Sequence, residues 1–167
     1  MPEHRTDASS ASHASRSDAT LTPYLLCRAG SAIVATALAS VRETMRPLPL
    51  TPLADLPSFV LGLAIVRGAP TPVVDVGALL APRERGEPTR FVTVQAGKRL
   101  AALAFESVIG VRELSAALLA EGRALVGELA GERLTAVGAL DGALLLVLEA
   151  ARVLPEDVWR RVEEARA

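Results

Sequence analysis

Three segments of the chain share one pattern, in which an apolar run is followed by a short turn containing glycine and then by a second apolar run. The segments are YLLCRAGSAIVAT, RFVTVQAGKRLAALAF and LTAVGALDGALLLVLE, with turn glycines at Gly30, Gly97 and Gly142. Tight hairpin turns require positive φ angles that glycine adopts without strain, and the Asp141-Gly142 pair is the strongest of the three signals. We therefore predict three β-hairpins and a chain that is mainly β.

Prolines restrict what the region between the first two hairpins can form. The segment PLPLTPLADLPSFVLG has four of them, at positions 47, 49, 52 and 57. Proline lacks a backbone N–H, so this density excludes a central strand or a long helix. We expect Pro57 to open a single helical turn that Gly62 ends.

Two short apolar runs follow, Leu63–Val66 and Val73–Val76. Their length and their β-branched residues favour strands. Between them, Arg67 and Gly68, followed by Pro70, predict a bend that reverses the chain.

The segment AIVATALASVRETM is rich enough in alanine to form a helix on propensity alone. We favour instead a strand through Ile33 and Val34, a turn, and a second strand over Val41–Thr44, because a glycine-serine hairpin turn precedes the segment.

Two other segments favour helix. Glu113–Gly122, ELSAALLAEG, has alanine and leucine at helical spacing and a closing glycine. The C-terminal segment has Pro155 at a first-turn position, acidic residues beside it, and an apolar face formed by Val158, Trp159, Val162 and Ala165. We expect this face, with Trp159, to pack on its own domain, and a partner contact by Trp159 is the alternative.

These patterns divide the chain into three parts. Residues 1–20 are rich in serine and alanine and lack periodicity, which predicts a disordered tail. Residues 21–154 form the β body, which is long enough for one substantial core or two small ones that share a wall. Residues 155–167 form the C-terminal helix.

The composition excludes several classes of protein. The chain has 18 basic and 19 acidic residues and only 3% aromatic residues, so it lacks the basic excess and stacking rings of a nucleic-acid binder. The longest uncharged run, Ala29–Val41, is too short to cross a bilayer, and the N-terminus lacks an apolar signal core. Cys27 is the only cysteine, and we expect it to be buried rather than reactive. A soluble cytoplasmic protein that does not insert into the membrane is expected.

The body also lacks the residues of common catalytic sites. Both histidines, His4 and His13, fall in the predicted tail. Ser-His-Asp triads and histidine or thiolate zinc sites are therefore excluded, and no glycine-rich phosphate loop is present, so we expect no cofactor and no metal. A small barrel enzyme stays as an alternative from another class.

Arg67 is the most unusual residue of the body, because it lies between two apolar runs and is followed by glycine. We expect its guanidinium to be partly buried and to need a carboxylate. Glu43 is the expected partner, with Asp75 and Asp55 as competitors. Such a pair serves either packing between strands or the binding of a partner, and the sequence leaves both open.

The segment from Ser40 to Leu80, SVRETMRPLPLTPLADLPSFVLGLAIVRGAPTPVVDVGALL, resembles the CheW-like coupling proteins of bacterial chemotaxis. It is similar to their run of a V-x-E-hydrophobic strand, a proline-punctuated loop, a P-x-x-hydrophobic-x-G turn, an R-G bend and a P-V-hydrophobic-D-hydrophobic strand. LAALAFESVIGV and ALDGALLLVLEAARVL resemble the family's later strands, so the similarity extends from Tyr24 to Leu154.

The resemblance implies two small SH3-like five-stranded β-barrels packed together, without catalytic activity. It implies binding to the cytoplasmic tip of a chemoreceptor and to the regulatory domain of a CheA-type histidine kinase, with other CheW-like proteins as further partners. In the family the receptor-binding groove lies between the two subdomains. The matching motif positions imply that four residues of this chain lie at or beside it: Val41, Glu43, Gly62 and Arg67.

The chain departs from the family pattern at two places. Ile65 stands where the family often has asparagine, and Phe105-Glu106 stands where it often has valine-aspartate. These departures suggest an alternative, an accessory protein that binds a receptor or another adaptor but not the kinase.

Overall fold

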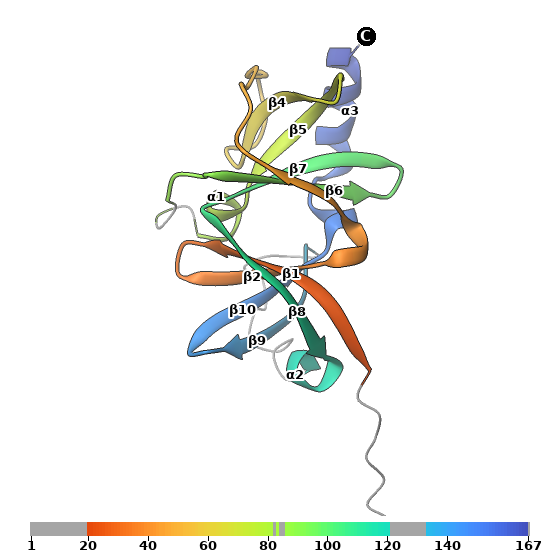
Figure 1. Cartoon of the computed structure of the whole chain (residues 1–167). Coiled ribbons are helices and arrows are strands. Elements are labelled where there is room, and N and C mark those ends of the chain that lie inside the picture. Colours follow the sequence, from red (N-terminus) through yellow and green to blue (C-terminus); the bar gives the residue numbers. More distant parts are fainter. Residues whose placement is uncertain (1–19, 82, 84–85, 121–132, 167) are drawn as a thin grey trace, which may run out of the picture.

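The computed structural model describes residues 20–81, 83, 86–120 and 133–166. Two β layers lie one above the other, and a C-terminal helix lies beside the upper layer (Figure 1). Apart from Thr20, the predicted disordered tail lies outside the described residues.

The first sheet contains the N-terminal and C-terminal strands of the body. Its order is β8-β1-β2-β10-β9, and β10 runs parallel to β2 while the other neighbours are antiparallel. The strands are β1 (Leu21–Ala29), β2 (Ala32–Ala37), β8 (Ser107–Ser115), β9 (Leu134–Leu140) and β10 (Ala143–Leu148).

The second sheet contains the middle of the chain. Its order is β3-β6-β7-β5-β4, and β5 runs parallel to β7. The strands are β3 (Val41–Met45), β4 (Val60–Val66), β5 (Ala69–Asp75), β6 (Arg90–Ala96) and β7 (Arg99–Phe105). The predicted class, mainly β with two five-stranded units, is confirmed.

Short helices connect or cover the strands. They are η1 (Leu38–Ser40), α1 (Val76–Leu80), α2 (Ala116–Ala120), η3 (Ala150–Arg152) and α3 (Glu156–Arg166). None of the helices in the described part of the chain is long and apolar enough to span a membrane.

All three predicted hairpins are present, as β1–β2, β6–β7 and β9–β10. The alanine-rich segment AIVATALASVRETM also folds as expected, with strand β2, the η1 turn and strand β3. Pairing with neighbouring strands therefore outweighs the helical propensity of alanine in this segment.

The prediction that Gly62 ends a helical turn is wrong. Pro57 does open one turn, in which the Val60 N–H donates to the Pro57 carbonyl at 2.9 Å, but this turn is not helical. Strand β4 begins at Val60, however, and Gly62 lies inside it at a bulge with φ of 138°. The reason is tertiary, because the Thr51 backbone exchanges two hydrogen bonds of 2.8 Å with Leu63 and lies against Gly62.

The predicted strand Val73–Val76 is also shifted. Strand β5 begins at Ala69, so Pro70 and Pro72 lie within it, and Val76 instead begins α1. β5 pairs with β7 only from Val73 onward. Both prolines precede this pairing, in the half of β5 that has no neighbour on that side, so their missing N–H groups cost no hydrogen bond to β7. Asp75 ends the strand and caps α1 by accepting a hydrogen bond of 3.0 Å from the Ala78 N–H.

The predicted helix over Glu113–Gly122 is confirmed in part, because a helix is present but begins later than expected. Only Ala116–Ala120 are helical, since β8 continues through Ser115 by pairing with Leu21. Residues 121 and 122 lie outside the described part.

The C-terminal helix α3 is confirmed. Val158, Trp159 and Val162 are buried, so Trp159 packs on its own domain as expected, whereas Ala165 is exposed. The Arg99 guanidinium lies 4.8 Å from the Trp159 ring centroid and donates to the Glu156 carboxylate, which holds the helix on the β6–β7 hairpin.

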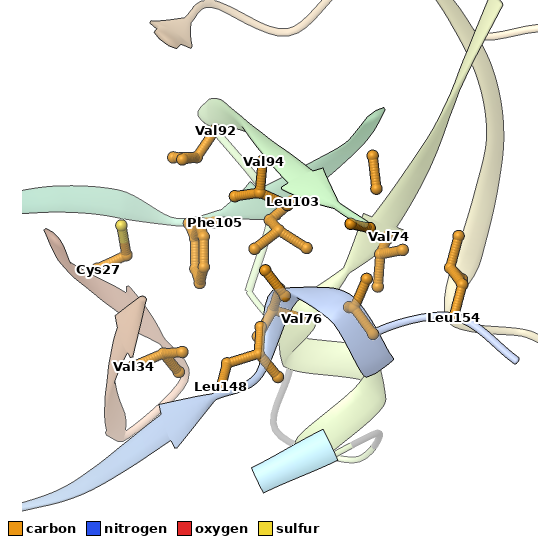
Figure 2. Packing of buried hydrophobic residues seen from close by; sticks show 14 of the residues in the cluster. Cys27, Val34, Val74, Val76, Val92, Val94, Leu103, Phe105, Leu148 and Leu154 are labelled. Atoms are coloured by element: carbon orange, nitrogen blue, oxygen red, sulfur yellow. The ribbon is translucent and has the colours of Figure 1, made fainter. Parts of the chain in front are cut away.

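One apolar cluster joins both sheets and α3. Figure 2 shows Cys27, Val34 and Leu148 of the first sheet facing Val94, Leu103 and Phe105 of the second. Burial raises the pKa of the Cys27 thiol to about 12, so this thiol is a neutral packing group at physiological pH, as expected.

Replacement of Gly62 tests the close approach of the Thr51 segment. A Cβ at Gly62 would lie 2.5 Å from the Thr51 carbonyl oxygen. We expect Gly62→Ala to lower the free energy of unfolding by about 3 kcal/mol, from backbone strain and overpacking together. Gly97→Ala is the matched control, because its φ of 64° is also positive but no heavy atom lies within 4 Å of the added Cβ. There we expect a loss of about 1 kcal/mol. Equal losses in urea unfolding would contradict this account.

Candidate functional site

Arg67 lies at the tip of the β4–β5 hairpin. Val66 pairs with Ala69, which leaves Arg67 and Gly68 as a two-residue loop with φ angles of 49° and 82°. Positive φ at both positions identifies a type I′ turn, whose twist matches that of the flanking strands. The bend is confirmed, but the Arg67 side chain is 80% exposed, so the expectation of partial burial is wrong. The tip of such a turn projects from its sheet, and the apolar runs on either side do not cover it.

The guanidinium of Arg67 binds Glu43 through two hydrogen bonds. Nε donates to Oε1 at 2.8 Å and Nη2 donates to Oε2 at 2.7 Å, which is a bidentate ion pair. Glu43 is therefore the partner, as expected. Of the two competitors, Asp75 caps α1 with its carboxylate. Asp55 is contacted by a different arginine, since its backbone carbonyl accepts a hydrogen bond from Arg161.

This ion pair connects the two edges of the second sheet. Glu43 lies on β3 at one edge, and the β4–β5 hairpin lies at the other. A short edge-to-edge contact between residues 24 apart in sequence thus helps to close the sheet into a barrel.

Thr93 on β6 fixes the backbone of Glu43. Its Oγ1 accepts from the Glu43 N–H at 3.2 Å and donates to the Glu43 carbonyl at 3.4 Å, beside a bulge between Val41 and Glu43. The sequence analysis missed Thr93. A lone threonine in the apolar run RFVTVQA was the available signal, because a buried hydroxyl requires a partner.

The pair remains ionised at neutral pH. Hydrogen bonding by Arg67, reinforced by its charge, holds the pKa of the Glu43 carboxyl below its ordinary value of 4.5. The same contact raises the pKa of Arg67. Because solvent screens an ion pair of this exposure, its contribution to folding stability is small.

An open pocket of about 440 Å³ lies beside the ion pair. Its residues come from β3, β6, β7 and the β4–β5 hairpin, all in the second sheet: Arg42, Glu43, Val66, Arg67, Thr93, Gln95 and Leu100. Arg42 donates to the Gln95 side-chain oxygen at 3.0 Å from Nη2. The pocket therefore combines aliphatic surface with fixed polar groups, a combination found at protein-binding surfaces.

The other two candidate residues lie apart from this pocket. Val41 is half-buried on β3 and packs against the cluster that joins the sheets. Gly62 is buried under the Thr51 backbone in β4. The structure thus brings Glu43 and Arg67 together, while Val41 and Gly62 shape the strands that carry them.

A family model described as the CheW-like domain matches residues 23–158. The chain belongs to the CheW-like family. Members of this family are non-catalytic scaffold or adaptor proteins of chemotaxis systems, so the alternative of a small barrel enzyme is set aside.

Solved structures include a relative with the same fold. The crystal structure of the scaffolding protein TtCheW from Thermoanaerobacter tengcongensis matches this CheW-like protein with a TM-score of 0.68 and 17% sequence identity. The match covers 78% of this chain and 90% of that one. A search of curated proteins gave no match.

The pKa of Glu43 provides a direct measure of the ion pair. In an NMR titration of the side-chain carboxyl carbons, we expect the Glu43 midpoint below 4.5 in the unchanged protein. The stabilisation that depends on its charge is present above pH 4.5 and is lost as the pH falls through the lower, folded-state value. Arg67→Gln should raise the midpoint to 4.5 or above, because partial burial of the carboxylate is then uncompensated.

The control for this titration is Arg42→Gln. Arg42 lines the same pocket but bonds the neutral Gln95, so its loss should leave the Glu43 midpoint nearly unchanged. An equal shift in both variants would mean that general charge, rather than the bidentate contact, sets the pKa.

Proposed function

We propose that this CheW-like protein couples chemoreceptors to a CheA-type histidine kinase in a bacterial chemotaxis or motility pathway. It binds the regulatory domain of the kinase and the cytoplasmic tip of the receptor, and its place is the cytoplasm, where both partners are reached. Family membership supports the general adaptor role, and the two specific partners are those that the family resemblance implies.

The observation that carries this proposal is the exposed bidentate pair of Arg67 and Glu43 beside an open pocket. An exposed pair adds little to stability, yet here Thr93 and a type I′ turn fix both of its members. Fixed, partly solvated charges steer association and set specificity more than they stabilise a fold. This favours partner recognition over packing, the two roles that the sequence left open.

The four candidate residues have two kinds of role in the proposal. Arg67 and Glu43 contact the partner directly. Val41 and Gly62 position them, Val41 by anchoring β3 to the core and Gly62 by allowing the Thr51 segment to pair with β4.

The mechanism is differential binding by a rigid adaptor. Since one apolar cluster holds both sheets together, a single adaptor keeps kinase and receptor next to each other when both are bound. One receptor conformation binds better when the kinase is active. The fraction of active kinase then changes by an amount set by the difference in binding free energy between the active and inactive states.

Ile65 supports the alternative of an accessory protein that binds a receptor or another adaptor but not the kinase. Its side chain is 59% exposed on β4, two residues before Arg67. An exposed isoleucine beside the candidate site changes the surface offered to a partner and so favours a changed partner set.

A parallel binding assay separates the two candidates. The full chain is titrated with the cognate kinase regulatory domain and, separately, with a receptor tip fragment. We expect saturable binding to both. Receptor binding without kinase binding would replace the coupling role with the accessory one, and binding to neither would overturn the proposal.

Substitutions at the pair test direct contact. We expect Arg67→Ala to weaken binding of the receptor fragment by about fivefold or more, the effect of losing an interface side chain that contributes about 1 kcal/mol, with little change in melting temperature. Arg112→Ala is the control and should leave binding nearly unchanged, because Arg112 forms an exposed ion pair with Asp141 on the first sheet, outside this pocket.

A double-mutant cycle with Glu43→Gln then measures the coupling of the two side chains in the complex. If the folded Arg67→Ala protein binds as tightly as the unchanged one, the pair only braces the sheet.

A further inference from the structure

Glu106 is the single residue between β7, which ends at Phe105 in the second sheet, and β8, which begins at Ser107 in the first. The chain thus crosses from one barrel to the other within one residue. Figure 1 shows β8 running from the level of α1 down across the first sheet to α2. A change in backbone direction at Glu106 would rotate one barrel against the other.

Four hydrogen bonds meet at this residue. Its Oε1 accepts from the Gly30 N–H at 3.0 Å and from the Gly86 N–H at 2.9 Å. Its own N–H donates to the Arg28 carbonyl at 3.1 Å, and its carbonyl accepts from the Thr89 hydroxyl.

These partners belong to different barrels. Gly30 is in the β1–β2 turn and Arg28 in β1, both of the first sheet, whereas Gly86 and Thr89 precede β6 of the second. One carboxylate oxygen therefore links the two barrels through backbone groups, and a charged acceptor makes both bonds strong.

The position of Gly86 is adapted to this carboxylate. A Cβ added there would lie 2.3 Å from the Glu106 Oε1, so a side chain at position 86 would displace the carboxylate. The close approach of the Gly86 backbone to Oε1 is thus possible because this residue is glycine.

The apolar cluster between the sheets does not by itself determine their angle. Apolar contacts are non-directional and tolerate small rearrangements, whereas hydrogen bonds to fixed backbone groups are directional. We propose that Glu106 is a clamp that sets the relative orientation of the two barrels, and hence the geometry in which surfaces on both are presented.

Local amide exchange tests the clamp. In Glu106→Ala, we expect the Gly30 and Gly86 amides to exchange about tenfold faster, because each loses a bond to a charged acceptor. Glu106→Gln retains an oxygen at this position and should restore much of the protection. Glu113→Ala is the control, an exposed glutamate of the same β8 strand. Unchanged exchange at both glycines in Glu106→Ala would overturn the proposal.

Orientation is measured by pulsed electron resonance between two spin labels at exposed positions. One is on Lys98→Cys in the β6–β7 turn of the second sheet, and the other is on Leu144→Cys in β10 of the first. The buried Cys27 is replaced by alanine throughout. We expect one narrow distance distribution in the parent protein and a shifted or wider one in Glu106→Ala.

Gly86→Ala gives a second, independent test of orientation. Because the clash falls on the end of a flexible side chain, this variant should fold and show the same change in distance. The proposal fails if either folded variant, Glu106→Ala or Gly86→Ala, keeps the parent distribution. Neither test requires a partner, so the outcome is independent of the proposed coupling role.

Discussion

The structure depends on one apolar cluster shared by the two sheets and α3. Among the described residues, 19 buried side chains form this cluster, whereas the two clusters confined to single sheets contain six buried residues each. We expect neither barrel to be stable alone, because small cores do not offset the entropy of ordering a chain. The length of the chain allows one substantial core or two small ones that share a wall. The large cluster has members in both sheets, so the two barrels are expected to unfold together.

Aliphatic residues build this core almost alone. Phe105 and Trp159 are its only buried aromatic members among the described residues, and the rest is valine, leucine, alanine and one cysteine. β-branched side chains pack well on pleated sheets, and alternation along each strand can supply two clusters at once. Thus Val92 and Val94 face the shared cluster while Phe91, on the opposite face of β6, belongs to the smaller cluster of the second sheet.

The strands were predictable where the local pattern and the pairing agree. Glycine turns between apolar runs located three hairpins, and the Ile33–Val34 strand followed from its hairpin neighbour. The predictions failed where a distant segment decides the conformation. Gly62 was expected to end a helix because its neighbours are consistent with one, but Thr51 pairs along β4 and requires a bulged strand there. The second strand was expected to begin at Val73, where the apolar run begins, but β5 begins at Ala69 and includes Pro72. Sequence alone does not reveal that this half of β5 lies at an edge, where proline is tolerated.

The site shows the same division between local and tertiary information. The partnership of Glu43 and Arg67 was predictable, since few carboxylates in apolar surroundings were available, but the exposure of Arg67 was judged wrongly from its apolar neighbours. A local signal existed, because Arg67-Gly68 has the same two-residue form as Asp141-Gly142, and both adopt positive φ at both positions. The contribution of Thr93 depends on the register of β3 against β6, which no local pattern contains.

A shared apolar interior and fixed polar groups at the surface are connected in this molecule. The ion pair spans the two edges of the second sheet, and β3 follows directly from β2 of the first sheet through the three residues of η1. The ion pair is thus connected through Glu43 and β3 to the core that both sheets share. The directional contacts of Glu106 with its two glycine amides set the orientation of the barrels, while the apolar core supplies cohesion. An adaptor that couples two partners requires both properties. If its two halves could reorient freely, the conformation of one partner would not affect how well the other binds, and no coupling free energy would result.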